Sequence, residues 1–504
     1  MLYIGLDVGT SGCKASVCDA AGHIKAYAHR GYQAVSPMPG YVEIDARLVW
    51  GAVQETLAEI AAGPFGRDVG ALAVASFGEA VVLTGAAGEV LANSIYYSDI
   101  RGAEETQEIE AALTRERATA LTGMPPNAMF SANKLLWMKK HEPRLLERAR
   151  HTMLMGDFIG WKLTGERAID HSLASRTMLF DIKARRWSRE AADAVGLPLG
   201  GFSEPVPSGA VIGPLLPQVA GALGFPGRVM LVAGGHDQPL AALGSGAVRP
   251  GDSVDGMGSS ECVTMVLGEG ALSPESLARM ARYNFCAEPH VVPGAFVTLA
   301  FNASAGTAIQ WFKNRFFAAE AEAAQARGEN IYGLMDARCP EAPTGILFLP
   351  YVGGSGTPYL GASEGGAFVG LTLADGRDEM YKALLEGICF EIGFNLDLLA
   401  ECGHVPTELT AAGGGSRSRT LMQIKADVLG RRIAALETHE AGTVALAWLC
   451  AKAMGGIASL EEAAAQGVQR TAVFEPDAGR AAYYREAAER YRRLYPAIRS
   501  IATP

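Results

Sequence analysis

The chain has 504 residues, of which 49% are hydrophobic and 19% are charged, and its formal net charge is −10. This length exceeds one typical hydrophobic core, so two domains are expected, and the composition is that of a globular protein. The acidic balance disfavours nucleic acid and anionic membranes as general partners, although a local basic pocket for a nucleotide stays compatible with it.

No targeting or membrane segment is predicted. The first residues, Met-Leu-Tyr-Ile-Gly-Leu-Asp, lack the basic stretch of a signal peptide, and no run reaches the roughly 18 apolar residues of a membrane span. The eight cysteines are scattered without a CxxC pair, and they form no cluster at zinc-ligand spacing. We therefore expect reduced thiols, a cytoplasmic location and no membrane partner.

The first hundred residues predict an α/β domain. Residues 2–7, 13–19 and 24–29 have the pattern of strands joined by tight turns. Residues 46–62 have the apolar spacing of a helix, and residues 70–76 form a short apolar strand. Strands that alternate with helices in this way predict a mixed sheet.

The middle of the chain leads to a second strand-to-helix junction. Residues 103–200 favour helices, and residues 229–233 form a buried strand. This strand ends in Gly-Gly-His-Asp237, and a helix is predicted to follow.

After this junction the opening pattern starts again. Residues 253–266 read as strand, glycine turn and strand, as residues 3–17 do. Two interpretations stay open: an ancient duplication in which Gly256 stands in the place of Asp7, or a chance recurrence of glycine turns. We divide the chain into an N-terminal domain, residues 1–244, and a C-terminal domain, residues 245–504.

Both glycine turns suit a phosphate group. In Asp7-Val-Gly-Thr-Ser-Gly12 the glycines allow positive φ and let backbone N–H groups face an anion, while Thr10 and Ser11 add hydroxyls. Asp7 can hold Mg²⁺ directly or through water. Gly256-Met-Gly-Ser-Ser-Glu261 offers the same chemistry from the other half. An ordinary hairpin with a turn aspartate is the alternative for the first motif.

A third glycine-rich segment, Ala411-Ala-Gly-Gly-Gly-Ser-Arg-Ser418, precedes a helix predicted from about residue 419 to residue 429. Three glycines before a helix N-terminus let the backbone lie against a flat or anionic ligand. This favours a site for adenine and the α-phosphate over a plain helix-entry loop, for which one glycine is enough.

Two further segments carry candidate polar ligands. Asp237 lies between a strand and a helix, where it is either a helix cap or a reactive carboxylate, and the two glycines before it suggest close approach by another group. In Tyr97-Ser-Asp99-Ile-Arg101 an acid and a base lie two residues apart, and an exposed ion pair is the alternative to a binding role.

Several familiar signatures are absent from the sequence. The dipeptide Gly-Lys never occurs, which excludes a Walker A loop, and no GxGxxG or HExxH motif is found. Phosphates are therefore expected to bind to hairpin turns across a cleft between two domains.

Taken together, these motifs resemble the FGGY carbohydrate kinases, a branch of the fold group of actin, hexokinase and Hsp70. Each motif is loose, but their joint order is specific and covers essentially the whole chain. The segments that carry the resemblance are residues 4–11, 76–79, 95–101, 233–237, 258–260, 306–311, 365–371, 383–387, 413–418 and 423–427.

The resemblance implies an α/β fold of two ribonuclease-H-like domains, with mixed sheets flanked by helices and a cleft between them. It implies transfer of the γ-phosphoryl group of ATP to a hydroxyl of a small ketose or polyol, with Mg²⁺ near Asp7 and Asp237 as the base. The residues that it assigns to the nucleotide are Thr10, Ser11, Gly258, Ser259, Ser260, Gly306, Gln310, Gly413, Gly414, Gly415 and Ser418. Those that it assigns to the sugar are Glu79, Asp99, Arg101 and Asp237.

The chain departs from the family pattern at two positions. Glu79 stands where many members have glutamine, and an ionised glutamate only accepts hydrogen bonds. We therefore do not expect the pocket of a standard xylulokinase, and the Arg-Glu pair of glycerol kinases is also missing at this turn. His236, which neither subgroup has before the catalytic aspartate, is a candidate sugar contact or a packing residue.

Two other functions compete with the kinase. A chaperone or filament ATPase of the same fold group needs no sugar site, so Asp237 and the Asp99–Arg101 pair argue against it. A sugar-sensing module that has lost catalysis would not need both Asp7 and Asp237. A homodimer is expected only because closed two-fold assemblies are the commonest.

Overall fold

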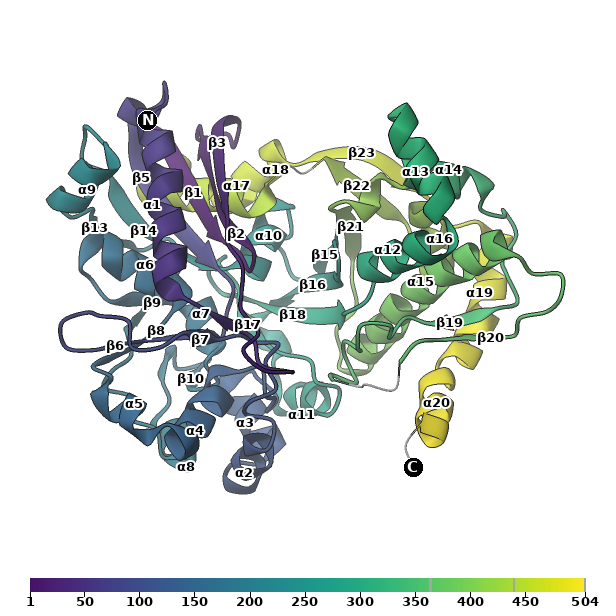
Figure 1. The fold of residues 1–504 in the computed structure, drawn as a ribbon, viewed down its shortest axis with the longest axis horizontal. Helices are drawn as coiled ribbons and strands as arrows, with labels where there is room; N and C mark the ends of the chain where they lie inside the picture. Colours follow the sequence, from purple (N-terminus) through teal and green to yellow (C-terminus); the bar gives the residue numbers. More distant parts are fainter. Residues whose placement is uncertain (362–364, 438–439, 503–504) are drawn as a thin grey trace.

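The computed structural model describes residues 1–361, 365–437 and 440–502 as two α/β lobes side by side (Figure 1). The first sheet has six strands in the order β13-β14-β5-β1-β2-β3. These are Val211–Pro214, Met230–His236, Val69–Ser76, Leu2–Val8, Gly12–Cys18 and Ile24–Gly31. β1 pairs antiparallel with β2 and parallel with β5, and β5 pairs parallel with β14.

The second sheet has seven strands in the order β17-β18-β16-β15-β21-β22-β23. These are Glu288–Pro289, Ala295–Asn302, Glu261–Gly268, Asp252–Met257, Glu408–Ala412, Ile433–Glu437 and Gln469–Phe474. β15 pairs antiparallel with β16 and parallel with β21, as β1 does with β2 and β5. The mixed pairing expected from the alternating pattern is thus present in both lobes.

The two sheets share details of their first hairpin. Asp7 and Gly256 are each the penultimate residue of the first strand of their sheet. In both turns the glycine that follows the strand donates a backbone hydrogen bond across the turn, from Gly9 to Gly12 and from Gly258 to Ser260, each at 2.9 Å. The shared topology supports a structural repeat over a chance recurrence of glycine turns.

Helices cover both sheets, and short strand pairs complete the lobes. The helices up to residue 244 are α1 Ala46–Ala62, α2 Glu105–Ala112, α3 Arg115–Thr122, α4 Ser131–His141, α5 Pro143–Arg148, α6 Met155–Thr164, α7 His171–Ser175, α8 Arg189–Val195, α9 Pro217–Leu223 and α10 Asp237–Gly244. The later helices are α11 Pro274–Arg282, α12 Gly306–Phe316, α13 Ala318–Arg327, α14 Ile331–Arg338, α15 Arg377–Glu401, α16 Arg419–Leu429, α17 Ala441–Ala453, α18 Leu460–Gly467, α19 Ala478–Tyr491 and α20 Leu494–Ala502. The short pairs are β4 Glu43–Ile44 with β7 Ser94–Ile95, β6 Val81–Thr84 with β8 His151–Leu154, β9 Ala168–Asp170 with β12 Glu204–Val206, β10 Phe180–Asp181 with β11 Arg186–Trp187, and β19 Leu347–Leu349 with β20 Ala367–Val369.

One helix from late in the chain belongs by its packing to the first lobe. α17 lies beside β1 and α10 in Figure 1, and its buried Trp448 shares a core with Tyr3 and Ala71 of the first sheet. The contact is close, because a Cβ on Gly5 would lie 2.0 Å from the carbonyl oxygen of Thr443. The boundary predicted near residue 245 separates the strands of the first sheet from those of the second. α17 comes after this boundary in the chain but packs on the first sheet.

Among the described residues, no helix combines the length and the apolar character needed to cross a membrane.

Candidate active site

Two adjoining cavities lie at and beside the junction of the lobes. The first, of about 440 Å³, has Asp7 and Asp237 on one wall and Gly256, Gly258 and Gly413 on the other. The second, of about 490 Å³, lies within the second lobe. Both are lined by Met257, Gly258 and Gly414, so they share a boundary. Each volume is within the range typical of small-molecule sites.

Asp7 brings a largely buried carboxylate, with 15% of its side chain exposed, to the first cavity. Its Oδ1 has no hydrogen-bond partner among the described residues, and its Oδ2 lies 3.4 Å from Nζ of Lys14. Lys14 also contacts Glu440 at 2.8 Å. Burial raises the pKa of Asp7 to about 6; Asp237 and Glu440 add to this, and Lys14 opposes it. A cation at this point would relieve the repulsion between the carboxylates.

The donor set fits Mg²⁺ only in part. No cluster of three or more potential metal-ligating side chains occurs among residues 1–361, 365–437 and 440–502. Mg²⁺ commonly binds through one or two carboxylates together with phosphate oxygens and water. The unpartnered Oδ1 of Asp7 suits that mode, because it supplies one ligand beside the glycine turns of the two hairpins.

The turn that contains Thr10 and Ser11 is fixed through its backbone. The hydroxyl of Tyr96 donates to the Thr10 carbonyl at 2.5 Å, and the backbone N–H of Tyr32 donates to the Ser11 carbonyl at 3.0 Å. Thr10 and Ser11 themselves are exposed, and neither of them lines either cavity. Their contact with phosphate stays a prediction.

The second hairpin is tied to α12. The Ser259 carbonyl accepts hydrogen bonds from the backbone N–H and the hydroxyl of Thr307, both at 2.9 Å. Ser260 lines the first cavity. A Cβ on Gly306 would lie 2.3 Å from the Gly258 carbonyl oxygen, so this contact between hairpin and helix requires glycine.

The second cavity is bordered by the triple glycine. Gly413 has φ +94°, and a Cβ there would lie 2.7 Å from the Met257 carbonyl oxygen. Ser418 caps α16 by accepting from the Leu421 N–H at 3.0 Å, and it donates to Asp336 of α14 at 2.6 Å. The apolar lining comes from Ile309, Leu385, Ile388 and Leu421, together with Tyr332 and Tyr381.

Gln310 does not share this placement. Ile309 lines the second cavity, whereas Gln310 is exposed and is not part of the lining. Its contact with the nucleotide stays a prediction. Gly414, Gly415 and Ser418 all line the cavity.

Asp237 is the first residue of α10, directly after β14. The cap position is occupied by His236, and no side-chain capping hydrogen bond is present at this helix end. The carboxylate of Asp237 is 32% exposed and lines the first cavity, so it is available to a ligand. The helix-cap alternative is therefore not what the structure shows.

The two glycines before Asp237 allow close approach by parts of the protein itself. A Cβ on Gly234 would lie 2.0 Å from the Val74 carbonyl oxygen, and one on Gly235 would lie 2.7 Å from a methyl group of Val291. The groups that approach closely are thus the neighbouring strand β5 and a side chain of the second lobe.

Glu79 and His236 are buried and paired. Glu79 has φ +65°, and its carboxylate accepts a hydrogen bond from Nε of Arg176 at 2.7 Å. Both ring nitrogens of His236 face carboxylates, Nδ1 at 2.8 Å from Glu288 and Nε2 at 3.2 Å from Asp237. Direct contact of either residue with a sugar stays a prediction.

Asp99 and Arg101 form a buried ion pair instead of the exposed pair of the simpler alternative. Both Asp99 oxygens are engaged, Oδ1 by the backbone N–H and Nε of Arg101 and Oδ2 by its Nη2 and the Val42 N–H. Arg101 also contacts Glu43 at 2.9 Å and lies over the ring of Tyr41. This pair fixes the loop around residue 42 in place, and its contact with a sugar stays a prediction.

Several residues near the site belong to none of the sequence motifs. Among them, only Lys14 could have been found from the sequence, because it lies opposite Asp7 in the register of the first hairpin. Glu440, Asp336, Arg176 and Glu288 come from distant segments without a local signature.

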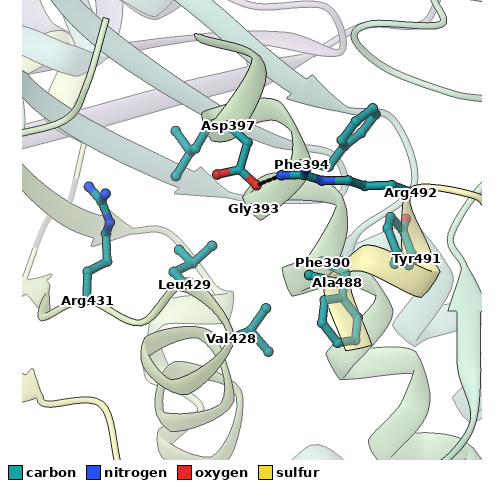
Figure 2. A pocket seen from close by; sticks show the side chains of 11 residues that line it. Phe390, Gly393, Phe394, Asp397, Val428, Leu429, Arg431, Ala488, Tyr491 and Arg492 are labelled. Carbon is teal, nitrogen blue, oxygen red and sulfur yellow. Dashed lines mark hydrogen bonds and ion pairs between the residues drawn. The ribbon is translucent and has the colours of Figure 1, made fainter. Parts of the chain in front are cut away.

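A third cavity lies between α15, α16 and α19 (Figure 2). Its volume is about 80 Å³, and its rim carries an ion pair of 2.6 Å between Asp397 and Arg492. This space suits a few water molecules and is too small for a nucleotide. No predicted site residue lines it.

Comparison with known proteins identifies relatives along nearly the whole chain. Residues 2–244 match the N-terminal domain of the FGGY family of carbohydrate kinases, and residues 256–454 match its C-terminal domain. The xylulose kinase of Escherichia coli K12 is 31% identical over 501 residues, which are 98% of each chain. A glycerol kinase of Gloeobacter violaceus is 30% identical over 434 residues, covering 85% of this chain and 83% of the relative.

Solved structures show the same architecture. The crystal structure of xylulose kinase from Rhodospirillum rubrum superposes with a TM-score of 0.89 at 27% identity and covers 100% of both chains. The kinase from Brucella ovis, at 29% identity, gives 0.87 and covers 99% of this chain and 100% of the other. The expected fold is confirmed, and nothing in these comparisons supports a filament ATPase or an inactive sensor. The chain belongs to the FGGY family of carbohydrate kinases and is an ATP-dependent sugar kinase.

Proposed function

We propose that this kinase phosphorylates a small neutral ketose or polyol, with Asp237 as the base that receives the proton of the attacking hydroxyl. One observation carries the proposal. Asp237 faces a cavity whose opposite wall is the Gly256–Ser260 hairpin, and that cavity adjoins a larger, mostly apolar one. A hydroxyl beside Asp237 and a nucleotide in the adjoining cavity would meet at the hairpin.

The nucleotide fits the second cavity by chemistry and by size. Apolar and aromatic side chains line the space where adenine would lie, and Asp336 and Ser418 offer polar groups at its edge. The phosphates would extend past Gly414 and Gly258 to the first cavity, where Thr10, Ser11, Ser259 and Ser260 are the proposed ligands. Backbone N–H groups in glycine turns are suited to this role.

Asp7 would hold Mg²⁺ through Oδ1, either directly or through water. When bound there, the metal would neutralise charge on the transferred phosphoryl group. Lys14 lies on the adjacent strand and keeps Asp7 and Glu440 from repelling each other.

Asp237 needs little basicity for its role. Phosphoryl transfer has a loose transition state, so positioning and charge stabilisation account for most of the catalysis. Closure of the two lobes would exclude water from the cleft and suppress ATP hydrolysis.

The charges around Asp237 favour a neutral sugar. Glu79 and Asp237 are acceptors for hydroxyl groups, and the nearby cations Arg176 and His236 are already bound by carboxylates. An acidic sugar would therefore meet repulsion without a free cation. Asp99 and Arg101 complete the proposed sugar site through the loop that they hold.

Asp237→Ala tests the base. Its sugar-dependent release of ADP should fall by about 10²- to 10⁴-fold, while binding of ATP stays intact. The measurement is a coupled assay with a panel of ketoses and polyols that begins with xylulose, the substrate named for several relatives. Asp193→Ala, which removes an exposed carboxylate of α8, is the matched control. Turnover of Asp237→Ala at the wild-type rate would refute the assignment.

Two broader properties belong to the same proposal. The eight cysteines are unpaired in the structure, in keeping with a reducing compartment such as the cytoplasm. A homodimer is the simplest assembly for an enzyme of this type. A mass measurement in solution that gives the mass of one chain would exclude the dimer.

A further inference from the structure

A chain of five buried or half-buried charged side chains connects the proposed sugar site to the proposed base. Arg176 binds Glu79 through Nε at 2.7 Å, and its Nη1 lies 3.5 Å from Glu288. The other oxygen of Glu288 lies 2.8 Å from Nδ1 of His236, and Nε2 of His236 lies 3.2 Å from Asp237. Charges alternate in sign along the whole chain, so each neighbour stabilises the next.

The central carboxylate comes from the opposite lobe. Glu288 lies on β17, at the edge of the second sheet, where it pairs with Val297 of β18. Arg176 follows α7, and His236 ends β14, so both belong to the first lobe. The side chain of Glu288 is 0% exposed, and such a carboxylate is tolerated only with good partners.

Asp237 is the most exposed member of this chain. Its carboxylate is 32% exposed at the first turn of α10, and His236 is its ion-pair partner. The backbone N–H of His236 donates to the hydroxyl of Ser172 at 2.8 Å, which fixes the main chain from which the ring projects. The imidazole is therefore a buried, doubly held support for the Asp237 carboxylate.

The ring needs both of its N–H donors, because a carboxylate faces each nitrogen. Burial lowers the pKa of His236, but Glu288 and Asp237 outweigh it and raise the value to about 9. The charged groups that face the ring are Asp237 from α10, Glu288 from β17 and Arg176 beyond α7. The imidazolium is thus the form present at neutral pH.

We propose that His236 is a positioning residue for Asp237. Glu288 fixes the orientation of the His236 ring and, through Arg176, the position of the turn that contains Glu79. One carboxylate of the ATP-binding lobe would then align both the base and the sugar turn of the other lobe. The proposal rests on the proposed function, since it takes Asp237 to be the base.

Two amide variants distinguish the roles of the two ring nitrogens of His236. In His236→Gln the amide nitrogen reaches the place of Nε2 and can still donate to Asp237, whereas in His236→Asn it reaches only the place of Nδ1 and Glu288. We expect kcat to fall by about 10- to 100-fold in His236→Asn and clearly less in His236→Gln, as for a misplaced catalytic group. The KM for ATP should stay within about twofold, because His236 does not line the nucleotide cavity.

The pH profile gives a second readout. In the wild type kcat should decline as the pH rises through about 9, when the imidazolium loses one N–H donor. His236→Gln should lack this alkaline limb. Equal kcat values in the two amide variants, together with an unchanged alkaline limb in His236→Gln, would overturn the proposal.

Glu288→Gln tests the link between the lobes. We expect its kcat to fall as in His236→Asn, since the support on Nδ1 is weakened. Glu391→Gln is the matched control, because it replaces another buried carboxylate of the second lobe. Glu391 lies on α15 and accepts hydrogen bonds from the hydroxyls of Tyr351 and Tyr491. The control should lose stability and keep its kcat. A similar kcat in both variants would show that Glu288 is only structural.

Nuclear magnetic resonance of ¹⁵N-labelled histidine tests the geometry without turnover. The His236 signal, assigned by its absence in His236→Gln, should titrate near 9 in the wild type and at lower pH in Glu288→Gln. Titration near the ordinary value of about 6.5 in the wild type would overturn the link. If no sugar in the panel is phosphorylated but His236 titrates near 9, the proposed function fails and the charge chain stands.

Discussion

Lys425 places a full charge inside the second lobe. Its side chain is 0% exposed and pairs with Asp255 of β15 and Glu261 of β16, the strands on either side of the second phosphate hairpin. The two carboxylates raise the pKa of Lys425 despite its burial, so it stays charged. Burial, with Asp255 adding to it, raises the pKa of Glu261 to about 8. One cation thus connects α16 to the hairpin that lines the first cavity.

Lys425→Met should lower the free energy of unfolding of the second lobe by about 3–5 kcal/mol, because it leaves two buried carboxylates without a cation. Urea unfolding followed by tryptophan fluorescence measures the change. The triple variant with Asp255→Asn and Glu261→Gln should recover most of the loss, since it also removes the two buried carboxyl groups that have lost their partner. A loss below about 1 kcal/mol in Lys425→Met would contradict this account.

At the scale of single elements, local sequence predicts much of the structure. The helix expected at residues 46–62 and the one expected at residues 419–429 have these bounds in the structure, because apolar spacing and caps are local signals.

Long-range pairing is what the sequence does not show. Glu79 and Arg176 are 97 residues apart, and His236 and Glu288 are 52 residues apart. Such partners follow from the topology of the lobes, and no spacing rule brings them together. The glycine turns, Asp7 and Asp237 were predictable, since strand, turn and helix signals surround each of them.

Gly5→Ala tests the contact between β1 and α17. The added methyl group would meet the Thr443 carbonyl oxygen at 2.0 Å, and neither the central strand nor the helix backbone can move away cheaply. We expect a loss of about 1–3 kcal/mol in stability, as for other overpacked cores. Calorimetry should show a lower melting temperature, whereas Gly51→Ala, with open space around its Cβ, should not. Equal melting temperatures in the two variants would contradict the contact.

At the scale of the whole molecule, the two lobes are not independent units. α17 and α18 close one face of the first sheet from a position late in the chain, and they bury Trp448 and Leu460 there. A fragment of residues 1–244 would expose this face to water.

We therefore expect residues 1–244 alone to lack a cooperative thermal transition and to aggregate, because the uncovered face is a large apolar patch. Circular dichroism during heating provides the measurement, with the full chain as the control. A sharp transition in the fragment would show that the first lobe folds without α17.

The boundary that the two cavities share at Met257, Gly258 and Gly414 has a consequence for inhibitor design. A compound that joins adenosine to a polyol through a short polyphosphate linker would occupy both cavities at once. Its second half would bind at a high effective concentration set by the linker, so its affinity would exceed that of either half alone. Relatives are named for xylulose and for glycerol, so selectivity among them would come from the groups placed beside Asp237.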